Sequence, residues 1–100
     1  MPSYRKVAEL PGKSAADLYK KVSEGLTGLE ATLQSVPGGA DARTEHDASA
    51  HKVTIFSKFI NATLVCHEGR IELNGALSWI AMPFKSKIDE VLDRWLKKTF

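Results

Sequence analysis

Apolar and polar residues alternate along four segments of the chain, and this period of two predicts β-strands with one buried face. The four segments are Ser3 to Leu10, Lys52 to Phe59, Asn61 to His67 and Arg70 to Trp79. A tight-turn sequence separates the last two, so they are expected to pair as an antiparallel hairpin. Thr44 to Ala50 is polar and is expected to be an edge strand or one arm of a hairpin.

Two other segments repeat their apolar residues every three or four positions, which is the period of an amphipathic helix. The first follows Ser14, a good N-cap, and its stripe consists of Leu18, Val22, Leu26, Leu29 and Leu33. Gly25 and Gly28 interrupt this stripe. They predict a close backbone approach to the sheet, a bend, or an earlier helix end near Gly25.

The second predicted helix extends from Lys85 to Phe100, and Pro83 suits its first turn because the missing N–H is harmless there. Its apolar face consists of Phe84, Ile88, Val91, Leu92, Trp95 and Leu96. The helix is expected to pack this face against the sheet.

The resulting order, β-α-β-β-β-α, predicts an α+β fold. We expect a mostly antiparallel sheet of four or five strands with two helices packed on one face. One hundred residues make a single domain, residues 1–100. Val36 to Ala40 is the clearest break between elements. The residues expected to share one core are Val7, Leu18, Val22, Leu26, Ile55, Leu64, Ile71, Leu73, Leu77, Ile88, Leu92 and Trp95.

Composition and charge narrow the class of protein. The chain is 43% hydrophobic and 26% charged, and its net charge of +2 is too balanced to indicate a nucleic-acid partner or an anionic membrane. No apolar run reaches the roughly 18 residues that a transmembrane helix needs, and no apolar signal segment follows the basic pair near the N-terminus. The single cysteine excludes an internal disulfide. These features favour a cytoplasmic location.

The residues that could support catalysis or bind a metal lack a suitable spacing. His46 and His51 are five positions apart, so on a regular strand they face opposite sides. Cys66 and His67 are adjacent, which again separates their side chains. Cys66 shares an apolar strand face, so a buried and inert thiol is expected. We therefore predict no catalytic residue, no metal site and no cofactor, and a protein that is not an enzyme.

The segment from Trp79 to Phe84 has the strongest functional signal, because alternation fails there. Trp79 and Ile80 would point to opposite sides of a strand, although both are large and apolar. The helices must cover part of this segment, and any remainder would be an exposed patch that seeks a partner. Core and interface both remain open as interpretations. The candidate residues for binding a partner, or the surface of an apolar polymer or a lipid-like material, are Trp79, Ile80, Met82 and Phe84.

Two functions are compatible with these features. The leading hypothesis is a non-catalytic binding or assembly module that acts through the apolar segment, with a homodimer as one way to bury it. The alternative is a carrier that holds an apolar small molecule between the sheet and the C-terminal helix. Aromatic residues that would suit such a cavity are Phe56, Phe59, Trp79, Phe84 and Trp95.

Residue types in the second half of the chain follow a spacing shared with a known family. They are Phe56, the Ile60-Asn61-Ala62 bend, the strand Arg70-Ile71-Glu72-Leu73, and Leu77 to Phe84 leading into Ile88, Val91 and Leu92. From Phe56 onward this pattern resembles the small bacterial polyhydroxyalkanoic acid system proteins of the granule-region family. The opening strand, the break at Pro11-Gly12 and the first helix fall in a similar order. The resemblance implies a cytoplasmic accessory protein linked to polyester storage granules, and it does not imply an enzyme.

Overall fold

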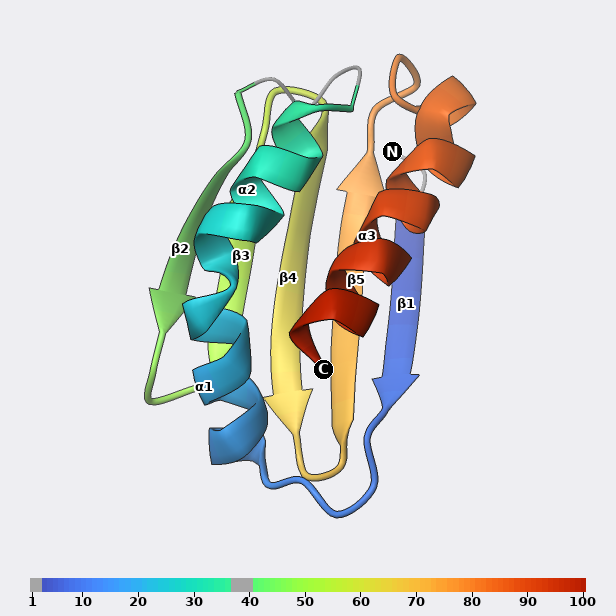
Figure 1. The fold of residues 1–100 in the computed structure, drawn as a ribbon. Helices are drawn as coiled ribbons and strands as arrows, with labels where there is room; N and C mark the ends of the chain where they lie inside the picture. Colours follow the sequence, from blue (N-terminus) through green and yellow to red (C-terminus); the bar gives the residue numbers. More distant parts are fainter. Residues whose placement is uncertain (1–2, 37–40) are drawn as a thin grey trace.

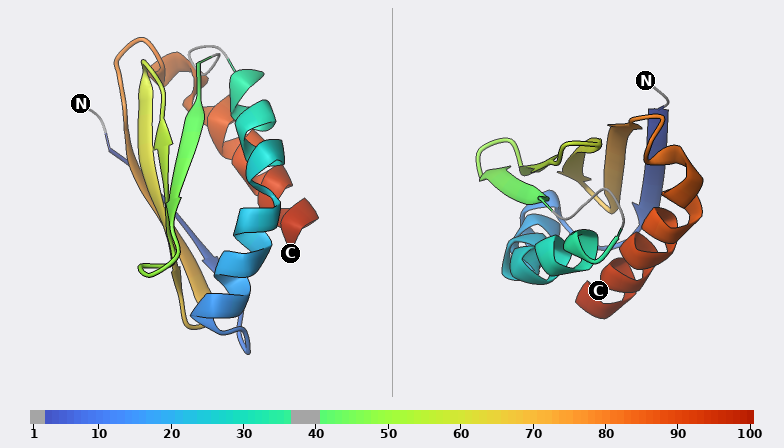
Figure 2. Two further views of the ribbon diagram at one scale, coloured as in Figure 1. Left: turned by 90° about the vertical axis from the view of Figure 1, so that its left-hand side faces the viewer. Right: turned by 90° about the horizontal axis from the view of Figure 1, so that it is seen from above.

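Five strands form one antiparallel sheet in the computed structural model, which describes residues 3–36 and 41–100 (Figure 1). Their order across the sheet is β1-β5-β4-β3-β2. The strands are β1 (Ser3–Glu9), β2 (Arg43–Asp47), β3 (Lys52–Phe56), β4 (Ile60–His67) and β5 (Arg70–Leu77). The helices are α1 (Ala15–Glu24), α2 (Leu26–Gln34), the short 3₁₀ helix η1 (Met82–Phe84) and α3 (Lys85–Thr99). The α+β fold with helices on one face of the sheet is therefore confirmed (Figure 2).

The first predicted helix is divided into α1 and α2 at Gly25, so three α-helices replace the two that were expected. The Gly25 N–H donates to the carbonyls of Lys21 and Val22, while its own carbonyl accepts a hydrogen bond from the Trp95 indole at 3.0 Å. A Cβ at Gly25 would lie 3.3 Å from the side chains of Trp95 and Thr99. The close approach predicted here is thus to α3 and not to the sheet.

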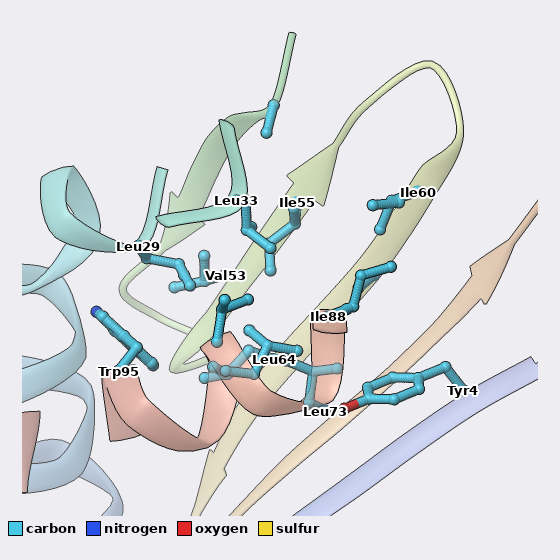
Figure 3. Close-up of a cluster of buried hydrophobic side chains, with 14 of the residues drawn as sticks. Tyr4, Leu29, Leu33, Val53, Ile55, Ile60, Leu64, Leu73, Ile88 and Trp95 are labelled. Carbon is cyan, nitrogen blue, oxygen red and sulfur yellow. The ribbon is translucent and has the colours of Figure 1, made fainter. Parts of the chain in front are cut away.

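One face of the sheet is covered by the helices, and the core lies between them (Figure 3). The α-helices contribute buried side chains at a helical period: Leu18, Val22, Leu29, Leu33, Ile88, Val91, Leu92 and Trp95. For two residues of the predicted core list, the predicted burial is wrong or only partly right. Val7 is exposed, because β1 turns Tyr4 and Ala8 toward the helices and the alternate residue toward the open face. Leu26 is only half-buried.

Several predicted boundaries shift by a few residues. Strand β3 ends at Phe56 and β5 ends at Leu77, which leaves the connections after them longer than expected. The edge-strand interpretation of Thr44 to Ala50 is confirmed by β2, which pairs with β3. Ile60-Asn61-Ala62, expected as a bend, instead forms the start of β4. The break predicted from Val36 to Ala40 falls largely on residues 37–40, which lie outside the described residues.

Within the described ranges, no helix combines the length and the apolar character needed to cross a membrane.

Candidate functional site

The connection from β5 to α3, residues 78–84, forms a short loop whose backbone is held in place by hydrogen bonds. The Ser78 N–H donates to the carbonyl of Phe59, in the neighbouring connection between β3 and β4, at 2.9 Å. The Ser78 carbonyl accepts from the Ala81 N–H at 3.0 Å, and the Ala81 carbonyl accepts from the Phe84 N–H at 2.9 Å. Trp79 and Ile80 therefore occupy the two central positions of a hydrogen-bonded turn. We call residues 78–84 the aromatic loop.

The aromatic loop exposes large apolar side chains to solvent. Trp79 is 76% exposed, Ile80 63% and Phe84 37%. Met82, predicted to belong to the same surface, is instead half-buried and packs against the core, because the turn directs Ala81 and Met82 toward the interior. The structure thus brings three of the four predicted site residues together on the surface. The sequence left open whether this segment is core or interface. Met82 packs against the core, whereas Trp79, Ile80 and Phe84 lie on the surface.

Cations flank the apolar centre of the loop. The Lys58 Nζ lies 5.4 Å from the centroid of the Phe59 ring, in the connection that the loop contacts. Lys85 and Lys87 are exposed in the first turn of α3, directly after the loop. Acidic groups lie among these cations. The Glu90 carboxylate is 4.0 Å from the Lys87 Nζ, Asp89 of the same helix interacts with Lys85, and the Asp41 carboxylate accepts a hydrogen bond from the Lys58 N–H at 3.0 Å. An apolar tip with a rim of mixed charge is suited to an apolar surface that carries polar groups.

The groups that could perform chemistry lie elsewhere in the fold. Cys66 is buried, and burial raises the pKa of its thiol to about 11, so the thiol is protonated and unreactive near neutral pH. On the open face of the sheet, the Glu72 carboxylate binds Arg5 at 2.7 Å and lies 3.7 Å from His67. These contacts are those of a cross-strand ion pair. Over the described part of the chain, no group of three or more His, Cys, Asp or Glu side chains could hold a metal ion.

The two histidines that the sequence placed on opposite faces both approach Tyr19 of α1. The Tyr19 hydroxyl lies 2.9 Å from Nδ1 of His46, and the ring centroids of Tyr19 and His51 are 5.6 Å apart. The prediction failed because His51 is not on a strand: β2 ends at Asp47, and His51 belongs to the turn that follows, with φ of 49°.

A polar cluster between β1 and α3 was not predicted. The Tyr4 hydroxyl donates to the Asp89 carboxylate at 2.6 Å, and the Lys6 Nζ lies 3.0 Å from Asp89 and 2.6 Å from Asp93. Burial, followed by the hydrogen bond to Asp89, raises the pKa of Tyr4. The hydrogen bonds from Tyr4 and Lys6 lower the pKa of Asp89. The cluster anchors α3 to the edge of the sheet. It could not be predicted without the strand order, because its residues come from the two ends of the chain.

The space between the sheet and α3, where a carrier would hold its ligand, is filled. The cavity among Tyr4, Leu73 and Ile88 has a volume of about 10 Å³. This is roughly the space of one water molecule. The described interior therefore gives no support to the carrier hypothesis in the position expected for it.

Comparison with known proteins adds information on the fold alone. No family model matches the chain, and no curated protein matches it. Among solved structures, a DUF4468 family protein from Bacteroides ovatus is similar, with a TM-score of 0.55 and 15% sequence identity. The similarity covers 74% of this chain and 52% of that one, so the chain spans about half of its length. The resemblance to the granule-region family therefore rests on the residues quoted from the sequence.

Proposed function

We propose that this protein is a non-catalytic binding module that attaches to an apolar surface through the aromatic loop. The observation that supports this most directly is the exposure of Trp79 and Ile80, at 76% and 63%, on a turn whose backbone is fixed by hydrogen bonds. Turn positions are ordinarily filled by small or polar residues, which would serve the fold as well. Contiguous apolar side chains at such positions indicate a contact with something outside the chain.

The size of the loop favours attachment to an extended surface over a stable homodimer. An aromatic side chain buries about 150–250 Å² when fully covered. Trp79, Ile80 and a partly exposed Phe84 therefore supply roughly half of the ~800 Å² that each partner buries in a standard protein interface. Exposed side chains of this size can still insert into a soft or porous surface, where no matching protein face is required.

The surface we propose is that of a polyester storage granule in the cytoplasm. Two observations support this choice: the resemblance of the second half of the chain to granule-region proteins, and the chemistry of the exposed side chains. A polyester presents alkyl groups together with ester carbonyls, which accept hydrogen bonds and donate none. Tryptophan combines a large apolar body with an N–H donor, so Trp79 suits a surface of both kinds.

Partition onto particles of poly(3-hydroxybutyrate) tests the proposal. Replacing Trp79 by Ser is expected to weaken binding about tenfold or more, because a fully buried large apolar side chain contributes about 1.5–3 kcal/mol. Phe84 and Phe100 provide a matched pair, since they are 37% and 38% exposed and stand just before and just after α3, roughly 22 Å apart. Phe84→Ser is expected to weaken binding severalfold, whereas Phe100→Ser is expected to leave it unchanged.

Sedimentation velocity of the same variants distinguishes surface binding from self-association. A monomeric wild type that binds the particles supports the proposal. A dimer that dissociates on Trp79→Ser, with no loss of particle binding, would assign the loop to a subunit interface. Equal partition of the wild type, Trp79→Ser and Phe84→Ser would contradict the proposal.

A further inference from the structure

A groove of about 710 Å³ runs along the outside of the molecule between α3 and the α1–α2 pair. Trp95 forms part of its lining, where the indole N–H donates to the Gly25 carbonyl at 3.0 Å. The volume lies in the range of 300–1,000 Å³ that is typical of small-molecule sites. The groove is separate from the aromatic loop and does not involve the proposed granule contact.

One wall of the groove carries only small side chains. Gly28, Ala31, Thr32 and Ser35 of the α2 segment line it. A Cβ added at Gly28 would meet no atom within 4 Å, so this position faces open space. A glycine in a helix interior costs about 1 kcal/mol relative to alanine. The packing of α2 does not require Gly28, whereas a ligand that lies against the helix backbone would.

The charges around the groove are mainly positive. Lys21 of α1 and Arg94 and Lys98 of α3 line it, against the single lining carboxylate of Glu24. Arg94 also forms an ion pair with Glu90, which lies outside the lining. The helices α1–α2 and α3 run in opposite directions (Figure 1). Lys21 precedes Gly25 by one turn and Lys98 follows Trp95 by about one turn, so both lysines lie on the same side of the Trp95–Gly25 contact.

We infer that this groove binds an anionic amphiphile, a small molecule with one carboxylate and an apolar body. The carboxylate lies toward Lys21 and Lys98, which line the groove on the same side of the Trp95–Gly25 contact. The apolar body extends past Trp95 and along the bare backbone at Gly28, where no side chain obstructs it. Charge complementarity selects an anion over a neutral or cationic ligand, and Ala31, Val91 and Trp95 give the lining an apolar part against which a tail can lie.

Tryptophan fluorescence provides a direct measurement, because the chain has two tryptophans and one of them can be removed. In the Trp79→Ser variant, Trp95 is the sole indole and lies in the groove. Titration with decanoate is expected to change the Trp95 emission in a saturable manner, whereas decanol is expected to bind at least fivefold more weakly. Lys98→Gln in the same background is expected to weaken decanoate binding severalfold and to reduce its dependence on salt.

Gly28→Leu and Thr27→Leu provide the steric test, because the two adjacent helix positions differ in whether they line the groove. Both substitutions introduce a good helix former, so neither is expected to unfold the protein. Gly28→Leu is expected to weaken decanoate binding tenfold or more, and Thr27→Leu is expected to leave it unchanged. Absence of saturable binding at millimolar decanoate, or equal binding by the Gly28→Leu and Thr27→Leu variants, would overturn the inference. Binding of decanol as strong as that of decanoate would overturn the role of the lysines.

Discussion

The two tryptophans of the chain occupy opposite kinds of environment. Trp95 of α3 is 6% exposed, packs against Gly25, and donates its indole N–H to the Gly25 carbonyl. Trp79 is 76% exposed and lies on a turn that other residues hold in place. The first is explained fully by the fold, whereas the second has no role in the packing. Substitutions at Trp79 can therefore separate binding from folding, and those at Trp95 cannot.

The largest expected difference is in how substitutions at Trp95 and at Trp79 change the stability of the fold. Trp95→Ala should lower the free energy of unfolding by about 3–5 kcal/mol, because it leaves a cavity and removes the bond to Gly25. Trp79→Ser should change it by no more than about 0.5 kcal/mol, as for other exposed positions. Urea denaturation of the two variants measures both values. A loss of several kcal/mol in Trp79→Ser would mean that the aromatic loop belongs to the fold.

The contact around Trp95 can be examined through Gly25, which lies between α1 and α2, and Gly28, which lies within α2. Gly28→Ala should raise the free energy of unfolding by about 0.5–1 kcal/mol, because the helix gains and the new methyl group meets nothing within 4 Å. Gly25→Ala should raise the free energy of unfolding by less, or should lower it, because the new Cβ would lie 3.3 Å from the side chains of Trp95 and Thr99. Thermal denaturation of the pair distinguishes them. An equal gain at both positions would mean that α3 does not press on Gly25.

A smaller effect, with a defined pH dependence, is expected where α3 meets β1. Hydrogen bonds from Tyr4 and Lys6 hold the pKa of Asp89 below its ordinary value, so the folded state binds this proton less readily than the unfolded state. The stabilisation is therefore present above about pH 4, the ordinary carboxyl range, and is lost as the pH falls through the lowered pKa. Asp89→Asn should reduce the loss of stability between pH 7 and pH 3, as measured by urea denaturation. An unchanged pH dependence in this variant would show that other carboxylates account for it.

The sequence predicted the elements whose apolar period is long and regular. Helix α3 repeats its buried residues over four turns, and Ile88, Leu92 and Trp95 all lie in the core. The first strand was harder, because Lys6 shares the covered face with Tyr4 and reaches Asp89 and Asp93. A lysine on the covered side disguises the alternation, which explains why Val7 was assigned to the core.

The candidate site could be predicted in part. The failure of alternation at Trp79 and Ile80 indicated that both could not be buried by one strand, and both are exposed. The inward direction of Met82 depends on the turn geometry of residues 78–81, which apolar spacing does not encode. The groove beside Trp95 depends on how α3 crosses the α1–α2 pair, and no local pattern specifies that crossing.

The proposed contact of the exposed Trp79 with an apolar surface is tested most directly by the fluorescence of this residue alone. Trp95→Phe retains an aromatic ring in the core and leaves Trp79 as the sole indole. In this variant, the emission of Trp79 should be that of an indole in water when the protein is free. On addition of poly(3-hydroxybutyrate) particles, the emission should shift to the blue, and the further substitution Ile80→Ser should reduce the bound fraction. An unshifted emission from protein that has sedimented with the particles would show that attachment occurs elsewhere, and would contradict the account.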